Sequence, residues 1–151
     1  MSDWADWMEF ASQEVFESML GVRAARIDAA ACSGTSDLTA IVSLTGSPSG
    51  VLSISCQSAA AAHIAMRMLG SSAPEPDDNA MDALGEVCNM VAGSIKSRLS
   101  ASEDLCRISV PTIIGGNNYC VRSMVNGEHY ELCLDFEGKP VKLSLEIHHP
   151  S

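Results

Sequence analysis

The chain is poor in aromatic and in basic residues. Its 151 residues include two Trp, two Tyr and three Phe, and nine Lys and Arg against 19 Asp and Glu. The resulting net charge of −10 repels the phosphates of nucleic acids and anionic membrane surfaces. No apolar run approaches the roughly 20 residues that a membrane-spanning helix needs. We therefore expect no nucleic-acid partner and no membrane partner, and a protein partner with a basic rim fits better.

The cysteines lack the spacing of a metal site, and no CxxC pair occurs. The first residues are acidic and do not resemble a secretory leader. Most of the cysteines lie in apolar segments, which favours reduced, buried side chains in a cytoplasmic protein. We therefore predict a cytoplasmic location, no metal site and no cofactor of its own. The six cysteines are Cys32, Cys56, Cys88, Cys106, Cys120 and Cys133.

The hydrophobic fraction is 46%, enough at this length for the core of one domain covering residues 1–151. Periodicity predicts helices over residues 3–20, 57–69 and 78–99, and β-strands over 38–45, 51–56, 107–114, 119–125, 129–136 and 141–148. Residues 23–31 are ambiguous and include a possible short strand. The pair Asn126-Gly127 is a strong hairpin signal, which predicts an antiparallel meander in the last third. We predict an α/β (α+β) domain with helices on one face of a largely antiparallel sheet.

The chain contains a weak internal repeat. Residues 14–21 (EVFESMLG) align without gaps with residues 86–93 (EVCNMVAG), and each copy precedes a β-rich section. The matching order of helix and strands favours a duplication. The first copy is degenerate, because Glu17 stands where the second copy has Asn89.

The helix predicted over residues 78–99 has two separate faces. On a helical wheel, a polar stripe falls within about 60° and the apolar stripe lies on the opposite side. Gly93 in the polar stripe destabilises the helix by about 1 kcal/mol relative to Ala. Close approach of another backbone at this position would explain why a glycine is present. Gly85 beside Glu86 is a second unusual glycine, and both are predicted to contact a partner. The polar stripe is Asp82, Glu86, Asn89 and Gly93, and the apolar stripe is Leu84, Val87, Cys88, Val91, Ile95 and Leu99.

The pair Glu86 and Asn89 suits one kind of chemistry. An Asn carboxamide has a donor and an acceptor, does not titrate near neutrality, and can orient a water molecule. Hydrolysis of a phosphoryl group needs such alignment more than it needs a base. Glu86 could act as a base or pair with a partner's Lys or Arg. Without a metal site, the helix would have to complete an active site on another protein.

The pattern Asp82-x-x-x-Glu86-x-x-Asn89, with Gly93 after it and Pro111-Thr112 further on, resembles the CheC/CheX/FliY family of chemotaxis phosphatases. The order of helices and strands extends the resemblance over nearly the whole chain. Because members of the CheC branch carry two active motifs and this chain has one, it is most similar to the CheX branch.

The resemblance implies a phosphatase that hydrolyses the phospho-aspartate of a CheY-like receiver domain in two-component chemotaxis signalling. Asn89 would orient the attacking water, Glu86 would contact the receiver's lysine, and Asp82 would have a lesser role. The resemblance places Mg²⁺ in the receiver, and it implies a homodimer that joins sheets edge to edge. Two alternatives remain open, a receiver- or motor-binding module that hydrolyses nothing and a structural dimerisation domain.

Overall fold

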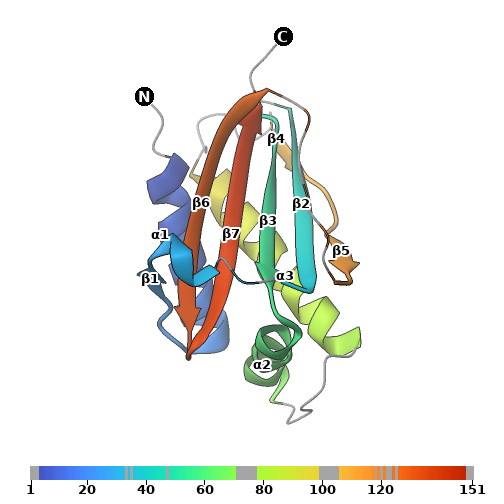
Figure 1. Ribbon diagram of the computed structural model, residues 1–151. Helices are drawn as coiled ribbons and strands as arrows, with labels where there is room; N and C mark the ends of the chain where they lie inside the picture. The colour runs from blue at the N-terminus through green and yellow to red at the C-terminus, as the bar shows by residue number, and fades with distance from the viewer. Residues whose placement is uncertain are drawn as a thin grey trace.

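The computed structural model describes residues 4–32, 34, 36–46, 48–70, 78–98, 106–117, 119, 121, 124 and 126–148. These residues form three α-helices, a 3-10 helix (η1) and a seven-stranded sheet in which all paired strands are antiparallel (Figure 1). The helices are α1 (Trp4–Leu20), η1 (Ala29–Cys32), α2 (Ser58–Leu69) and α3 (Asp78–Ser97). The strands are β1 (Ala25–Ile27), β2 (Leu38–Gly46), β3 (Gly50–Cys56), β4 (Cys106–Ile108), β5 (Thr112–Gly115), β6 (Gly127–Phe136) and β7 (Lys139–His148).

The three α-helices pack against the sheet, and α1 and α3 lie behind it in Figure 1. Along β3, Leu52 and Ile54 are buried in the core, whereas Ser53 and Ser55 alternate with them and point to the other face, here called the outer face. This alternation of apolar and polar residues is what a sheet covered by helices on one side requires. The predicted α+β fold class is confirmed.

The strand order reflects the internal repeat. The sheet runs β1-β6-β7-β3-β2-β4, and exchanging the two halves of the chain gives the same order in reverse. Each half supplies a helix, a short strand and a hairpin. Each short strand pairs with the hairpin of the other half, β1 with β6 and β4 with β2, and β3 pairs with β7 at the centre. The duplication inferred from the two helices therefore extends to the sheet.

The predicted meander is wrong in its first part. The run expected over residues 107–114 is split into β4 and β5, which both pair with β2. Pro111 lacks an N–H for the ladder and lies in the interruption. Residues 119, 121 and 124 are outside strands, and the rest of the expected strand 119–125 lies outside the described residues. Tyr119 instead places its hydroxyl 2.7 Å from the Thr39 hydroxyl.

The hairpin between β6 and β7 turns in the gap expected between strands 129–136 and 141–148, whereas the turn expected at Asn126-Gly127 does not join two strands in the described residues. Gly127 opens β6, and the turn is formed by Glu137 and Gly138, which both have positive φ (49° and 88°). The Glu137 carboxylate accepts hydrogen bonds from Arg67 Nε (2.9 Å) and Nη2 (2.6 Å), and its Oε1 lies 2.8 Å from His63 Nε2. These contacts with α2 hold a non-glycine residue in the left-handed region. Local sequence carries no sign of them.

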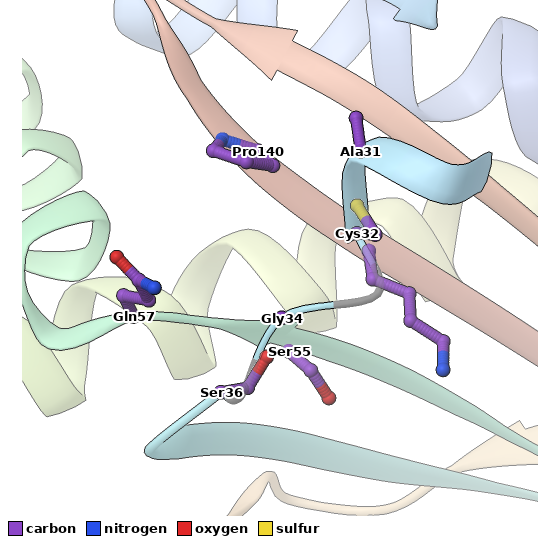
Figure 2. Close-up of a pocket in the computed structure, with 8 residues that line it drawn as sticks. Ala31, Cys32, Gly34, Ser36, Ser55, Gln57 and Pro140 are labelled. Carbon is purple, nitrogen blue, oxygen red and sulfur yellow. The ribbon is translucent and has the colours of Figure 1, made fainter. Parts of the chain in front are cut away.

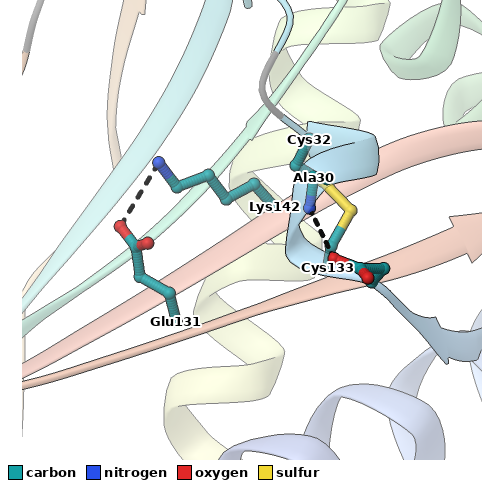
Figure 3. Close-up of a disulfide and its surroundings, with 6 residues drawn as sticks. Ala30, Cys32, Glu131, Cys133 and Lys142 are labelled. Atoms are coloured by element: carbon teal, nitrogen blue, oxygen red, sulfur yellow. Dashed lines mark hydrogen bonds and ion pairs between the residues drawn. A yellow bond between two sulfur atoms is a disulfide. The ribbon is translucent and has the colours of Figure 1, made fainter.

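The expectation of reduced cysteines is wrong for Cys32 and Cys133, which form a disulfide (Figure 3). Their Cα atoms are 6.1 Å apart across a sequence separation of 101. The bond forms because η1 crosses to the outer face and carries Cys32 to Cys133 of β6. Cys56, Cys88 and Cys106 are free and buried, as expected. Cys120 lies outside the described residues.

Candidate functional site

Helix α3 is fixed on the sheet by its apolar stripe. The predicted members from Leu84 to Ile95 are all buried, and Leu99 lies outside the described residues. The Cys88 thiol donates weak hydrogen bonds to the carbonyls of Ala40 (3.7 Å) and Leu52 (3.8 Å). Burial raises the pKa of this thiol to about 12, so it stays protonated and keeps these contacts near neutral pH. The orientation of α3 is therefore set by its buried side.

The polar stripe consequently lies on the solvent side of α3. Asp82 and Glu86 are exposed, and Asn89 and Gly93 are partly exposed. Within the part of the chain that the structure describes, the side chains of Glu86 and Asn89 have no hydrogen-bond or ion-pair partner. A carboxylate and a carboxamide three residues apart are thus free to bind groups of another molecule.

The two unusual glycines have different surroundings. At Gly93, a Cβ atom would meet no atom within 4 Å, so nothing in the described chain requires a glycine there. Gly85 is buried, and a Cβ atom would lie 3.3 Å from Pro111 Cγ and 3.3 Å from Ile113 Cδ1. Packing within the chain therefore accounts for Gly85, and its contact with a partner stays a prediction. Close approach by a partner at Gly93 also stays a prediction.

Helix α1 borders the C-terminal part of α3. The Ser94 hydroxyl donates a hydrogen bond to Glu14 Oε1 (3.1 Å), and the Arg98 guanidinium lies 3.9 Å from the centre of the Phe10 ring. Glu14 and Glu17 of the degenerate copy are both exposed. The exposed carboxylates of Asp82 and Glu86 make the solvent side of α3 acidic beside Asn89, which favours a partner that presents a basic group.

Residues 109–111, between β4 and β5, border the other side of the stripe, and sequence reasoning missed their position. Pro111 contributed to the family resemblance, but no expectation connected it with Gly85. The signal that could have done so is the glycine itself, because a glycine inside a helix often marks close approach of another segment. Val110 in this segment was not singled out.

A small pocket lies on the outer face, away from α3 (Figure 2). It is lined by η1 and by the outer sides of β3 and β7, including Cys32, Ser55 and Lys142. Because the sheet separates it from the stripe, the pocket is not part of the candidate site. Among the described residues, no group of three or more His, Cys, Asp or Glu side chains is placed to hold a metal ion. None of the described helices is both long and apolar enough to cross a membrane.

Comparison with protein-family models matches residues 38–137 to the family described as chemotaxis phosphatase CheX. The chain belongs to this family. The matched range contains the polar stripe of α3 and Pro111, whereas α1 lies before it. A comparison with curated proteins finds no significant match.

Solved structures share the fold at low sequence identity. CheX from Vibrio vulnificus superposes with a TM-score of 0.85 at 18% identity, covering 97% of each chain. A CheX–CheY–BeF3–Mg²⁺ complex from Borrelia burgdorferi gives a TM-score of 0.79 at 20% identity, covering 97% of this chain and 99% of the other. FliY from Thermotoga maritima gives a TM-score of 0.60 at 21% identity, covering 94% of this chain and 84% of the other. The predicted resemblance to CheX is confirmed.

Proposed function

We propose that this chain is a phosphatase for the phospho-aspartate of a CheY-like receiver domain in chemotaxis. The observation that carries the proposal is the placement of Glu86 and Asn89, side by side on the solvent face of α3 with no partner among the described residues. Membership of a family named for a chemotaxis phosphatase supports it. A relative that forms a complex with CheY, BeF3 and Mg²⁺ supports the choice of partner.

In the proposed reaction, α3 docks against the receiver and Asn89 enters its active site. The carboxamide holds a water molecule in line with the phosphorus atom. Its oxygen accepts a hydrogen bond from the water, and its NH2 group donates one to an oxygen of the phosphoryl group. The water oxygen attacks phosphorus, and the bond from phosphorus to the aspartyl oxygen breaks. The aspartate departs as a free carboxylate, and the inorganic phosphate keeps the oxygen and the two protons of the water. Glu86 pairs with a lysine of the receiver and fixes the docked geometry. Asp82 helps to orient the receiver on α3, and Gly93 lets the receiver backbone approach this helix closely.

Three further parts of the proposal concern the assembly. Mg²⁺ belongs to the receiver, so this chain needs no metal. A homodimer joined through sheet edges is proposed from the family resemblance, with β1 and β4 as the two edge strands at the ends of the sheet order. The cytoplasm is the proposed location, because receiver domains of this signalling class act there.

Release of phosphate from a panel of the host's phosphorylated receivers tests the proposal. Wild type should accelerate release from at least one receiver, and Asn89→Ala should slow this by about 100-fold, as expected for loss of one positioned polar group. Glu17→Ala is the matched control, because it removes an exposed side chain at the corresponding position of α1. It should leave the rate unchanged.

The same panel distinguishes the alternatives. Binding of BeF3-loaded receivers without accelerated release from phosphorylated ones would make the chain a binding module. If the chain neither binds any receiver nor accelerates phosphate release from it, the structural dimerisation domain is the hypothesis that is left. An Asn89→Ala protein as fast as wild type would remove Asn89 from the mechanism.

A further inference from the structure

Residues 109–111 form a fixed interruption of the sheet edge, here called the edge bulge. Its first residue is bonded to β2, since the Ser109 N–H donates to the Ser43 carbonyl (3.0 Å) and the Ser43 N–H donates to Ser109 Oγ (2.9 Å). The Ser109 hydroxyl also donates to the Val110 carbonyl (2.9 Å). On either side, β4 and β5 pair with β2. The backbone around Val110 is therefore held before any partner arrives.

The edge bulge also contacts α3 beside the polar stripe. Pro111 lies over Gly85, where a Cβ atom would come within 3.3 Å of its ring. Gly85 is three residues after Asp82 and four before Asn89, so all three are neighbours on the helix surface. The ring of Pro111 thus covers the helix surface directly next to the proposed catalytic carboxamide.

Val110 is the apolar side chain that this arrangement presents to solvent. It is 82% exposed, although its neighbours in the chain are anchored to β2 and to α3. An exposed valine is common on protein surfaces and by itself indicates nothing. Its position is informative, because the buried centre of an interface is apolar and a group that is already held in place loses little entropy on binding.

The first half of the chain lacks this feature. After β1, the chain enters η1 and crosses to the outer face, where Cys32 is bonded to Cys133 (Figure 3). In the described residues nothing equivalent to the edge bulge stands beside α1. Among the residues that the structure describes, a bulge of this kind accompanies α3, which keeps both Glu and Asn, and not α1.

We propose that Val110 is a binding residue for the same phosphorylated receiver, contacting an apolar side chain on the rim of its phosphate pocket. This inference rests on the proposed function. Val110 has no polar group in its side chain and so contributes affinity and receiver choice, while Asn89 contributes the chemistry. Preorganisation by Ser109 and Pro111 limits the entropy lost when the receiver docks.

Steady-state phosphate release and binding of the BeF3–Mg²⁺-loaded receiver test this division of roles. Val110→Asp should raise KM and the dissociation constant by about 10-fold or more and leave kcat within about two-fold of wild type. Val110→Ala should raise both constants by a smaller factor. Val51→Asp is the matched control, because it makes the same change at a partly exposed valine of β3 that alternates with the buried Leu52 and so lies on the outer face. It should change neither constant.

The outcomes separate this inference from the function on which it rests. If wild type is active but Val110→Asp keeps the wild-type KM and dissociation constant, Val110 is not a binding residue, and the phosphatase assignment stands. If Val110→Asp changes only the oligomeric state in size-exclusion chromatography, the bulge is a contact between copies and the inference is overturned. If wild type neither binds nor accelerates any receiver, the proposed function fails first.

Discussion

Helices α1 and α3 occupy matching places in the two halves of the fold, and each carries a glycine at the matching position of the repeat. Gly21 has φ of +70°, and α1 ends at the residue before it. Gly93 lies inside α3, which continues to Ser97. The same residue therefore stops one helix and leaves an open surface on the other. Both halves retain the strands that the fold needs. Glu17 and Asn89, at matching positions of the repeat, lie on the solvent side of their helices, where a substitution disturbs no packing.

The segments that follow the two short strands differ as well. After β1 the chain is bound covalently to the outer face, and after β4 it is held by hydrogen bonds and by Pro111 on Gly85. One half thus uses this segment to fasten the two halves together, and the other uses it to border α3. Duplication supplied two equivalent helices, and the local connections made them unequal.

Removing the disulfide should have the largest effect on stability and none on activity. Closing a loop of about 100 residues corresponds to roughly 5 kcal/mol in the chain-entropy model. Cys32→Ser and Cys133→Ser should each lower the free energy of unfolding by about this amount, measured by urea denaturation. Phosphate release should be unchanged, because the bond lies on the face opposite α3. Equal stability of wild type with and without reductant would contradict the prediction.

Restoring the motif in α1 should not restore catalysis. In an Asn89→Ala background, Glu17→Asn recreates Glu-x-x-Asn on α1, but no edge bulge is described beside α1, and this helix ends at Leu20. We expect phosphate release to stay about 100-fold below wild type, roughly 3 kcal/mol. Recovery to within 10-fold of wild type would show that the side chains alone make the site.

Alanine at the two glycines should act in opposite directions. Gly21→Ala places a side chain at positive φ and should destabilise the protein by about 1 kcal/mol. Gly93→Ala meets no atom within 4 Å and should stabilise it by up to about 1 kcal/mol through helix propensity. If the receiver approaches Gly93 closely, the more stable Gly93→Ala protein should release phosphate several-fold more slowly. An unchanged rate would remove the glycine from the interface.

The smallest expected difference concerns the two hairpins. The Arg67 hydrogen bonds, and then His63, hold the pKa of Glu137 below its ordinary value of 4.5, and no such clamp is described at the β2–β3 turn. His129 and then Lys142 lower the pKa of Glu131 in the same hairpin. A lowered folded pKa favours folding above pH 4.5, and this contribution is lost as the pH falls through the folded pKa. Urea denaturation at pH 7 and pH 3 should show a smaller pH dependence for Glu137→Gln than for wild type.

Sequence patterns predicted the elements of this fold better than its connections. The apolar stripe placed the long helix at residues 78–99, and α3 is Asp78–Ser97. The repeat motif indicated the duplication. In contrast, the contacts of Glu137 with α2, the split of β4 from β5 and the Cys32–Cys133 bond all depend on segments distant in sequence. Local periodicity carries no information about such contacts.

The candidate site shows the same division. The wheel placed Glu86 and Asn89 on the solvent side because the core stripe fixes the helix, and this needs only local spacing. The two glycines looked equivalent in the sequence, yet one is covered by Pro111 and the other is open. Only the packing of a strand connection from 26 residues further along the chain distinguishes them.

The exchange of short strands between the halves has a consequence for synthesis on the ribosome. Ala25 pairs with Asp135 and Ile27 with Cys133, so the first edge strand cannot be placed until nearly the whole chain has emerged. During that time Cys32 lacks its partner while Cys56, Cys88, Cys106 and Cys120 are made. Enclosure of Cys56, Cys88 and Cys106 in the core keeps their thiols from competing for Cys32. Folding of the core before oxidation therefore removes three of the four competing thiols.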